Sequence, residues 1–514
     1  MAEIIRSKGT TDSERYLARL ADRTFLNLWS YPNVYRDTFV NGKPAGKELC
    51  DLLVVCGDHV IIFSDKNIPW ASHKNIEVAW GRWYKRAVKE SVRQLRHAKQ
   101  LITQYPSRIF LDPRCIKALP IKLPPPESMK VHLVAIALGA HQACSDFFNG
   151  DSGSFIIRPS LIGDAHHNPS APHYFPFTIG DIDPDGSFIH VMNDVTLDVI
   201  FKELNTITDF TDYLDAKVAF LRSGRLFNTT GEEELLAYYL THLDGESHGF
   251  PNPKKDKHWE QNERLVLDQG FYASMLKNPQ YLRRKRADKN SYIWDRLIKA
   301  FTDHIIKGTS IIPEGQVFDV ANLEIGVRHM AHEPRLARRM YGDQIIEVLG
   351  VAHLTDRRFR AMIPSPAKPG NGTAFAFMTL AVPKRKLEGG YQQYRQVRTN
   401  ILQTYCMAIL YKQHHIRRIV GVAMEPPPQP GDSPGSSEDM IMIEQQVWTQ
   451  EMEDDLEHDC KVYDIMREDR FTTGNMGVTE YPEKENSVIS RTPHPGGMNR
   501  DQRRAMEARA RRRK

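Results

Sequence analysis

Residues 46–66, with the sequence GKELCDLLVVCGDHVIIFSDK, limit most strongly what this chain can fold into. Two short apolar runs, 52–55 and 60–63, are rich in leucine and β-branched residues and flank the turn-forming pair Gly57-Asp58. Runs of this kind around a glycine-containing turn are typical of a β-hairpin. The sequence therefore predicts two neighbouring strands in this stretch.

Polar residues stand on both strands of this hairpin. Asp51 precedes the first apolar run, and Ser64, Asp65 and Lys66 end the second. Because side chains alternate between faces, Ser64 and Lys66 share one face and Asp65 points to the other. An unpaired carboxylate is costly to bury, so Asp51 beside an apolar strand favours a functional role. An acid that holds a divalent cation, with a lysine that orients a water beside the phosphate, suits metal-dependent phosphodiester cleavage.

Helices are predicted on both sides of the hairpin. Residues 12–29 place apolar side chains at helical spacing, with Asp12-Ser13 as the expected N-cap and Glu14 in the first turn. Residues 78–101 carry a second apolar stripe at helical spacing. The order is therefore a helix with an acid, the hairpin, and a second helix.

This order resembles the PD-(D/E)XK nuclease superfamily, which includes restriction endonucleases and RecB-like nucleases. The resemblance covers roughly residues 10–140 and rests on Glu14, Asp51 and Lys66. It departs from the family at one position, because the usual Asp or Glu two residues before the lysine is Ser64 here. The resemblance implies an α/β fold, a restriction-endonuclease-like mixed sheet flanked by helices. The apolar run 131–138 predicts a buried central strand that continues this sheet.

The second helix offers a replacement for the missing acid. Some members of the superfamily have Ser-X-Lys and supply the carboxylate from the following helix, where this chain has Glu90 and, one turn later, Gln94. Glu90 can equally be an exposed acid that pairs with Lys89 or Arg93. Glu14 can likewise be a first-turn acid that interacts favourably with the helix dipole.

The resemblance also implies a cofactor and a substrate. Asp51, Glu14 and Glu90 are expected to hold Mg²⁺, or Mn²⁺ in its place, while Lys66 and Ser64 contact the attacking water or the phosphate. The expected partner is nucleic acid, with DNA as the first expectation. Two alternatives stay open: a catalytically degenerate relative that binds or scaffolds nucleic acid, and a nuclease of stress or phage defence that is held inactive until a signal arrives.

Length and composition give the remaining expectations about domains, cysteines and location. A chain of 514 residues suggests about three domains. It has no apolar run long enough for a membrane span and no apolar core of a signal peptide near its N-terminus. Its six cysteines are scattered without a CxxC pair, which argues against a zinc ribbon or a disulfide scaffold. We therefore expect a cytoplasmic protein that does not enter a membrane.

Three parts are predicted along the chain. Residues 1–225 form the nuclease-like domain with insertions, and residues 226–467 form a second mixed α/β module that provides substrate selection, oligomerisation or regulation. Residues 468–514 form a flexible basic tail. The second module contains no phosphate loop, dinucleotide-binding fingerprint or nucleophile elbow.

Positive charge gathers in the tail. Residues 499–514 carry eight Lys or Arg and two acids, so the rest of the chain has a net charge near −1. Such a tail can bind phosphate backbones without reading bases, or it can be a solvated terminus. Two further basic clusters, 282–286 and 335–339, are candidates for a nucleic-acid track or for solvated helix faces. The tail residues expected to contact nucleic acid are Arg503, Arg504, Arg509, Arg511, Arg512 and Arg513.

Overall fold

The chain divides into two compact units. Unit 1 comprises Met1–Leu282 and Arg296–Arg335, and unit 2 comprises Arg283–Asp295 and Leu336–Lys514. The computed structural model describes residues 3–40, 43–244, 247–251, 263–312, 319–367, 370–382, 389–427, 437–465, 474 and 477–482.

The structural division differs from the predicted one. The expected boundary between residues 225 and 226 lies inside unit 1, because β9 (Leu226–Thr229) pairs there with β6 (Ile156–Ile162). Most of the predicted tail, including its six named arginines, lies outside the described residues.

A six-stranded mixed sheet forms the centre of unit 1. Its order is β4-β1-β2-β3-β5-β8, with β3, β5 and β8 parallel and the other neighbours antiparallel. This confirms the coarse prediction of a mixed sheet flanked by helices. The strands are β1 (Ser30–Val40), β2 (Lys43–Cys56), β3 (His59–Asn67), β4 (Ile109–Phe110), β5 (Lys130–Leu138) and β8 (Ile189–Met192).

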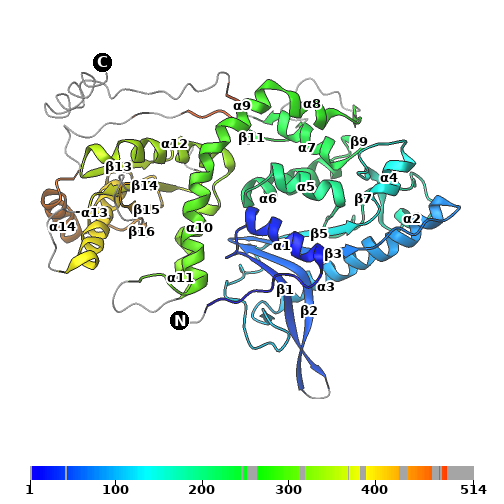
Figure 1. Cartoon of the computed structure of the whole chain (residues 1–514), viewed down its shortest axis with the longest axis horizontal. Coiled ribbons are helices and arrows are strands. Elements are labelled where there is room, and N and C mark those ends of the chain that lie inside the picture. The colour runs from blue at the N-terminus through cyan, green and yellow to red at the C-terminus, as the bar shows by residue number, and fades with distance from the viewer. Residues whose placement is uncertain are drawn as a thin grey trace. The chain divides into compact units, whose positions relative to one another are not determined.

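The predicted hairpin is the β2–β3 pair. Leu52–Cys56 pairs with His59–Phe63, and Gly57 in the turn has a φ of 58°, a value that favours glycine. The preceding hairpin, β1–β2, is longer and extends beyond the rest of the sheet (Figure 1). The buried strand expected at residues 131–138 is β5.

Helices cover both faces of this sheet. On one face lie α1 (Asp12–Thr24), α5 (Asp194–Glu203) and α6 (Ile207–Arg222), where a cluster of aromatic rings packs against the strands. The cluster consists of Phe25, Phe63, Phe201 and Phe210.

The first helix differs from its prediction at both ends. Its N-cap is Thr11, which forms a capping box with Glu14, rather than Asp12 or Ser13. It ends at Thr24 and not near Trp29, because the chain takes a left-handed φ of 63° at Leu26 before β1 begins.

The second predicted helix lies on the other face of the sheet and contains an irregular turn. It runs through α2 (Ile76–Tyr84), the π-helical turn η1 (Lys85–Lys89) and α3 (Glu90–Gln104). Helix α3 buries Leu95, Ala98 and Ile102 against strands β2, β3 and β5. The predicted stripe is therefore confirmed and longer than expected.

Unit 1 has a second, four-stranded sheet of order β12-β9-β6-β7. Short strands and helices surround it. These elements are β7 (Thr178–Asp181), β10 (Leu243–Asp244), β11 (Ser247–His248), β12 (Leu265–Leu267), α4 (His141–Phe147), η2 (Gly163–His167), α7 (Glu232–Thr241), α8 (Phe271–Lys277) and α11 (Val320–Ala331).

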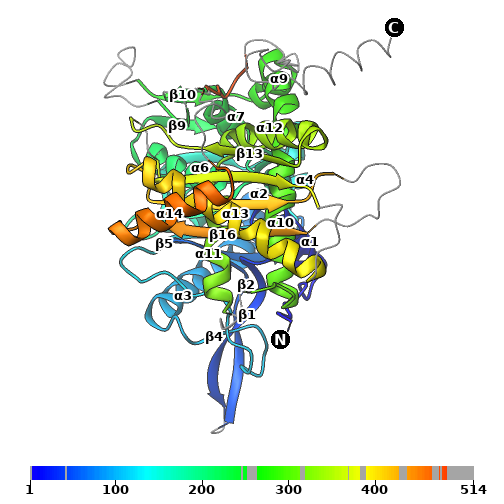
Figure 2. The ribbon, with the colours of Figure 1, turned by 90° about the vertical axis from the view of Figure 1, so that its left-hand side faces the viewer.

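Unit 2 is built on a four-stranded sheet of order β13-β14-β15-β16, in which only β14 and β15 are parallel. Figure 2 shows α13 and α14 next to each other against this sheet. Unit 2 is therefore mixed α/β, as predicted for the second module. The strands are β13 (Arg357–Met362), β14 (Thr373–Leu380), β15 (Arg418–Met424) and β16 (Glu438–Glu444).

The remaining helices complete the described part of the chain. They are α9 (Pro279–Ala287), η3 (Asp288–Ser291), α10 (Tyr292–Lys307), α12 (Arg335–Val351), η4 (Ala352–Leu354), α13 (Gly390–Lys412) and α14 (Gln450–Val462). No helix within the described ranges combines the length and the apolar character needed to cross a membrane.

Both basic clusters, 282–286 and 335–339, contain buried arginines. Arg284 is 4% exposed and pairs with Glu480 at 2.7 Å, whereas Arg286 in the same cluster is exposed. Arg338 is 3% exposed and pairs with Asp295 at 2.7 Å, and Arg335 and Arg339 are buried as well. The cluster 335–339 is therefore neither a solvated helix face nor available as a track for nucleic acid, and neither is Arg284.

Candidate active site

Asp51 and Lys66 lie together where β2 and β3 stop pairing. Asp51 is buried, and the Nζ of Lys66 lies 3.5 Å from its Oδ2. Regular pairing ends at Leu52 and Phe63, and the Asp51 Oδ2 accepts the next backbone N–H, that of Asp65, at 2.5 Å. The structure thus brings together the acid and the lysine on which the resemblance most depends.

Two further acids adjoin this pair and share one amide donor. Asn33 on β1 is fully buried and donates its Nδ2 to Glu14 Oε2 at 2.9 Å and to Glu48 Oε1 at 2.7 Å. The register of β1 against β2 shifts directly afterwards, between Val34 and Tyr35, and such an irregularity redirects side chains. We call four residues the acid cluster: Glu14, Glu48, Asp51 and Asp65.

Burial and mutual repulsion raise the pKa of three of the four acids: Glu48, Asp51 and Asp65. Burial raises the pKa of Asp65 to about 6, a hydrogen bond from Ser13 opposes the rise, and the charges of Asp51 and Glu14 add to it. Burial also raises the pKa of Asp51, against the lowering effect of Lys66. One lysine therefore does not neutralise the negative charge gathered here.

Glu48 and Glu14 differ in how well they are stabilised. Partial desolvation raises the pKa of Glu48, which the hydrogen bond from Asn33 opposes and the charge of Asp51 increases. For Glu14, burial acts to raise the pKa, but hydrogen bonds from Thr10 and Asn33 outweigh it, so the pKa is lowered. Glu14 is thus held as a carboxylate next to acids that resist ionisation.

Ser64 faces the helix rather than the acid cluster. It is fully buried, and its Oγ donates to Gln94 Oε1 at 3.0 Å and lies 3.2 Å from Ser91 Oγ, both on α3. These contacts fix the strand that carries Lys66 against α3. We infer that Ser64 has a positioning role.

Glu90 was expected to supply the acid that Ser64 lacks. Its carboxylate instead pairs with Arg93 at 2.9 Å, and its side chain is 48% exposed. The group of α3 that reaches β3 is the amide of Gln94, one turn further along. The structure therefore gives Glu90 the exposed ion pair that was its alternative interpretation.

The chemistry of the acid cluster suits a divalent cation, although the cation's ligand geometry is not preformed. In the part of the chain that the structure describes, no three His, Cys, Asp or Glu side chains are arranged to hold one metal ion as they stand. Carboxylate oxygens are, however, the ligands that Mg²⁺ prefers. The Oδ1 of Asp65 is buried without a hydrogen-bond partner, so a cation would also satisfy this oxygen.

Sequence reasoning missed three residues of this site: Asn33, Glu48 and the contribution of Asp65. Strict alternation along β2 places Glu48 and Asp51 on opposite faces. The register shift of β1 against β2, between Val34 and Tyr35, breaks that alternation. No local sequence pattern predicts this shift. The one available signal was that Glu48 precedes Asp51 by three residues at the start of the apolar run.

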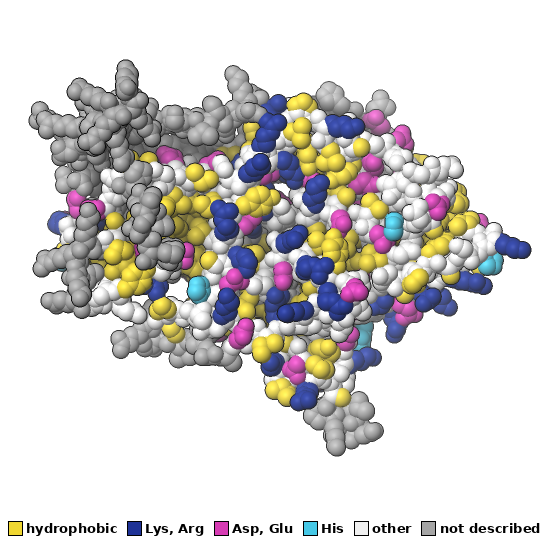
Figure 3. All heavy atoms as spheres, in the orientation of Figure 1, with side chains coloured by type: hydrophobic (Ala, Val, Ile, Leu, Met, Phe, Trp, Pro, Cys, Tyr) yellow, Lys and Arg dark blue, Asp and Glu magenta, His cyan; other side chains and the backbone are white. Residues whose placement is uncertain are grey.

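Lysine and arginine side chains line the helix behind β3. Figure 3 shows them along the lower right-hand edge, over α2 and α3. Lys89, Arg93 and Arg96 each have an acid partner, whereas no ion pair is found among the described residues for the other three. We call this exposed set the basic stripe: Arg82, Lys85, Arg86, Lys89, Arg93 and Arg96.

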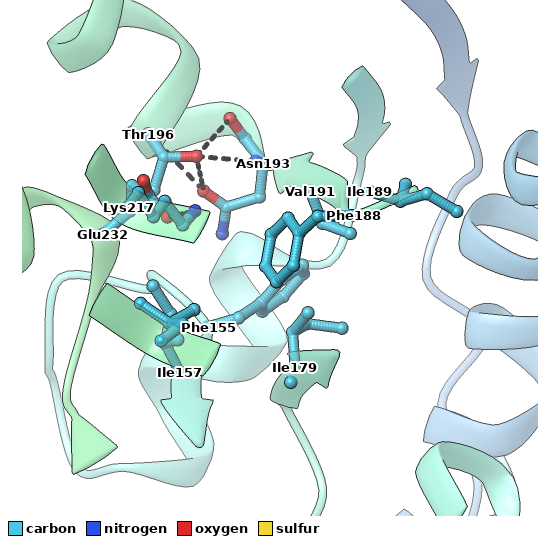
Figure 4. Close-up of a pocket in the computed structure, with 12 residues that line it drawn as sticks. Phe155, Ile157, Ile179, Phe188, Ile189, Val191, Asn193, Thr196, Lys217 and Glu232 are labelled. Atoms are coloured by element: carbon cyan, nitrogen blue, oxygen red, sulfur yellow. Dashed lines mark hydrogen bonds and ion pairs between the residues drawn. The ribbon is translucent and has the colours of Figure 1, made fainter. Parts of the chain in front are cut away.

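A small cavity lies elsewhere in unit 1, between its two sheets (Figure 4). Its volume of about 20 Å³ gives room for one water molecule. The polar groups that line it are already paired, Lys217 with Glu232 and Thr196 with Asn193. This cavity therefore belongs to the packed core and is not a substrate site.

Comparison with known proteins adds no relative: no protein-family model, no curated protein and no solved structure matches this chain. The function must therefore be argued from the acid cluster and its surroundings.

Proposed function

We propose that unit 1 is a metal-dependent nuclease that hydrolyses phosphodiester bonds of nucleic acid. One observation carries the proposal: Lys66 Nζ lies 3.5 Å from the buried Asp51 Oδ2, within a cluster of four acids. Carboxylates that attract a cation, beside an ammonium group for the phosphate, suit phosphodiester hydrolysis. The basic stripe supports a polyanionic substrate, since phosphate backbones are attracted by rows of Lys and Arg.

The residues have distinct proposed roles. Asp51, with Glu48 and Asp65, would hold Mg²⁺ or Mn²⁺, and Glu14 would complete the negative site. A bound cation would supply polarisation of the phosphate and a lowered pKa for a coordinated water. Lys66 would contact that water and the phosphate, since its ammonium group is held at the cluster by Asp51.

The test is cleavage of labelled duplex DNA, single-stranded DNA and RNA with Mg²⁺, Mn²⁺ or EDTA. We expect metal-dependent cleavage by the wild type. Lys66→Ala should lower the rate by roughly 10²- to 10⁴-fold, the range typical of a group that assists proton transfer. Asp51→Ala should lose cleavage through loss of the cation.

Lys202→Ala is a matched control, because Lys202 is an exposed lysine on α5 outside the site. It should cleave like the wild type, so loss of cleavage in Lys66→Ala purified in the same way would exclude a contaminating nuclease. Unchanged cleavage by both Lys66→Ala and Asp51→Ala in the purified, folded protein would overturn the site assignment.

A second candidate function is nucleic-acid binding without cleavage. It is favoured by Ser64, which offers no carboxylate at the usual acid position, and by Glu90, which is paired with Arg93. It predicts metal-independent binding and no cleavage of any of the three substrates under any of these conditions.

Regulation through unit 2 is a variant of the first proposal. A nuclease of stress or phage defence would cleave weakly alone and strongly once unit 2 binds a partner or ligand. Full activity of the purified chain without additions would contradict this variant and leave the nuclease proposal intact.

A further inference from the structure

A pocket of about 120 Å³ lies between the β1–β2 hairpin and the end of α3. Its walls combine apolar side chains with an aromatic ring and positive charge. Leu49, Leu101 and Ile109 form the apolar part, and Tyr105 adds its ring. The remaining lining residues are Arg36, Asp37 and Arg108.

The aromatic ring in this pocket is accessible. Tyr105 is 47% exposed, and the guanidinium of Arg108 lies 5.4 Å from the centroid of its ring. Asp37 holds Arg108 by an ion pair of 2.8 Å. A planar ligand can therefore meet an aromatic surface and a fixed cation together.

Arg36 has unused binding capacity. Its Nε is buried without a hydrogen-bond partner, and no acid within ion-pair distance is found for it among the residues described. Lys47 is its cross-strand partner on β2, so two positive side chains stand next to each other on the hairpin. An uncompensated cation at a partly apolar pocket favours an anion, such as the phosphate of a nucleotide whose neutral base lies in the pocket.

The surroundings of the pocket are positive as well. Burial lowers the pKa of His97 on α3, and the charges of Arg36, Lys47 and Arg93 lower it further. Cations from the hairpin and from α3 therefore lie close enough to act on the same side chain, His97. Arg93 also belongs to the basic stripe, so the pocket continues that positive surface.

The pocket adjoins the acid cluster along β2. Leu49 lines the pocket, and Asp51 follows two residues later, about 7 Å along a strand, whereas Glu48 points to the face opposite to Arg36 and Lys47. A phosphodiester held at Asp51 and Lys66 would therefore have a neighbouring nucleotide within reach of Tyr105 and Arg36.

We propose that this pocket binds an unpaired nucleobase of the substrate, next to the phosphate held at the acid cluster. This proposal rests on the proposed function, because it takes the ligand to be nucleic acid. Stacking on an aromatic ring accepts any base. A base in a duplex must first be unstacked and unpaired, so the pocket favours single strands over duplexes.

The test measures affinity rather than cleavage. The dissociation constants of a single-stranded DNA, the same strand with abasic positions, and a duplex are measured by fluorescence anisotropy in EDTA. We expect the wild type to bind the single strand more tightly than the abasic strand and the duplex. Tyr105→Ala should weaken single-strand binding by roughly 5- to 150-fold, the value of one stacked base.

Two variants act as controls. Tyr105→Phe keeps the ring and should keep the affinity. Phe227→Ala removes an aromatic ring of equal exposure, 47%, on β9 in the other sheet, and should bind like the wild type. Equal binding of normal and abasic strands by the wild type, or unchanged affinity of Tyr105→Ala, would overturn the proposal.

The two proposals fail separately. Metal-dependent cleavage with unchanged affinity of Tyr105→Ala would retain the nuclease and remove the base pocket. Base-dependent binding through Tyr105 without cleavage would retain the pocket and remove the nuclease.

Discussion

Unit 1 contains two groups of acids with different surroundings: the acid cluster and the three glutamates that begin α7. The three glutamates are 3–4% exposed, and each has its own donors. Glu232 accepts from Tyr213 and Lys217, Glu233 accepts from two serine hydroxyls, and Glu234 accepts from two backbone N–H groups.

Donors are unevenly distributed in the acid cluster. Glu14 accepts from Thr10, Thr11 and Asn33, whereas Glu48 has only a share of the Asn33 amide among the described contacts, and the Oδ1 of Asp65 has no hydrogen-bond partner. Fully paired acids contribute to holding a fold together, whereas acids short of donors mark a place where a cation or substrate completes the bonding. Three measurements test this comparison.

The largest expected effect is on stability at α7. Glu232→Ala would leave the ammonium of Lys217, which is 3% exposed, buried without its acid partner. Breaking a buried pair in this way costs about 3–5 kcal/mol, so we expect a strong fall in the midpoint of thermal unfolding. Glu48→Ala in the acid cluster is the control and should change stability by less than about 1 kcal/mol. Equal losses in the two variants would contradict the comparison.

The next effect is stabilisation by a cation. Mg²⁺ or Mn²⁺ should raise the unfolding midpoint of the wild type, by about 2.7 kcal/mol when the cation is 100-fold above its Kd. EDTA should reverse the rise. Asp51→Asn should abolish it, while a Glu233→Gln variant at α7 should retain it. A rise that persists in Asp51→Asn would show that the cation binds elsewhere.

The third effect concerns pH and is of similar size. Burial raises the pKa of Asp65 from the usual 3.8 to about 6, so the folded state keeps this proton longer than the unfolded state does. The protonated Asp65 therefore contributes to the free energy of unfolding below pH 4. This contribution of about 2–3 kcal/mol is lost as the pH rises through 6.

Asp65→Asn should remove that loss. Without added metal, we expect the variant to unfold at a higher temperature than the wild type at pH 8, with the difference shrinking towards pH 4. A difference of the same size at both pH values would show that ionisation of Asp65 is not its cause.

Local patterns were enough to predict much of the fold. Apolar runs and turn residues predicted the β2–β3 hairpin and β5, because these signals act within a few residues. The pairing of Asp51 with Lys66 also followed, since neighbouring strands of one hairpin carry both.

Contacts between distant segments were not predictable in this way. Asn33 reaches Glu14 and Glu48 only because β1 is irregular beside β2. A run of basic residues does not show which acids will pair with it. Arg284 and Arg338 were therefore taken as exposed, although they are buried in ion pairs with Glu480 and Asp295.

The π-helical turn η1 has a consequence for how this chain can change in length. An α-helix turns about 100° per residue, and a π turn takes up one additional residue within a single turn. Loss of one residue between Lys85 and Lys89 would therefore convert η1 to a regular α-helical turn and leave α3 close to its present rotation relative to α2. Ser91 and Gln94 would still meet Ser64. Loss of one residue from α2 would instead rotate α3 by about 100° and remove both contacts.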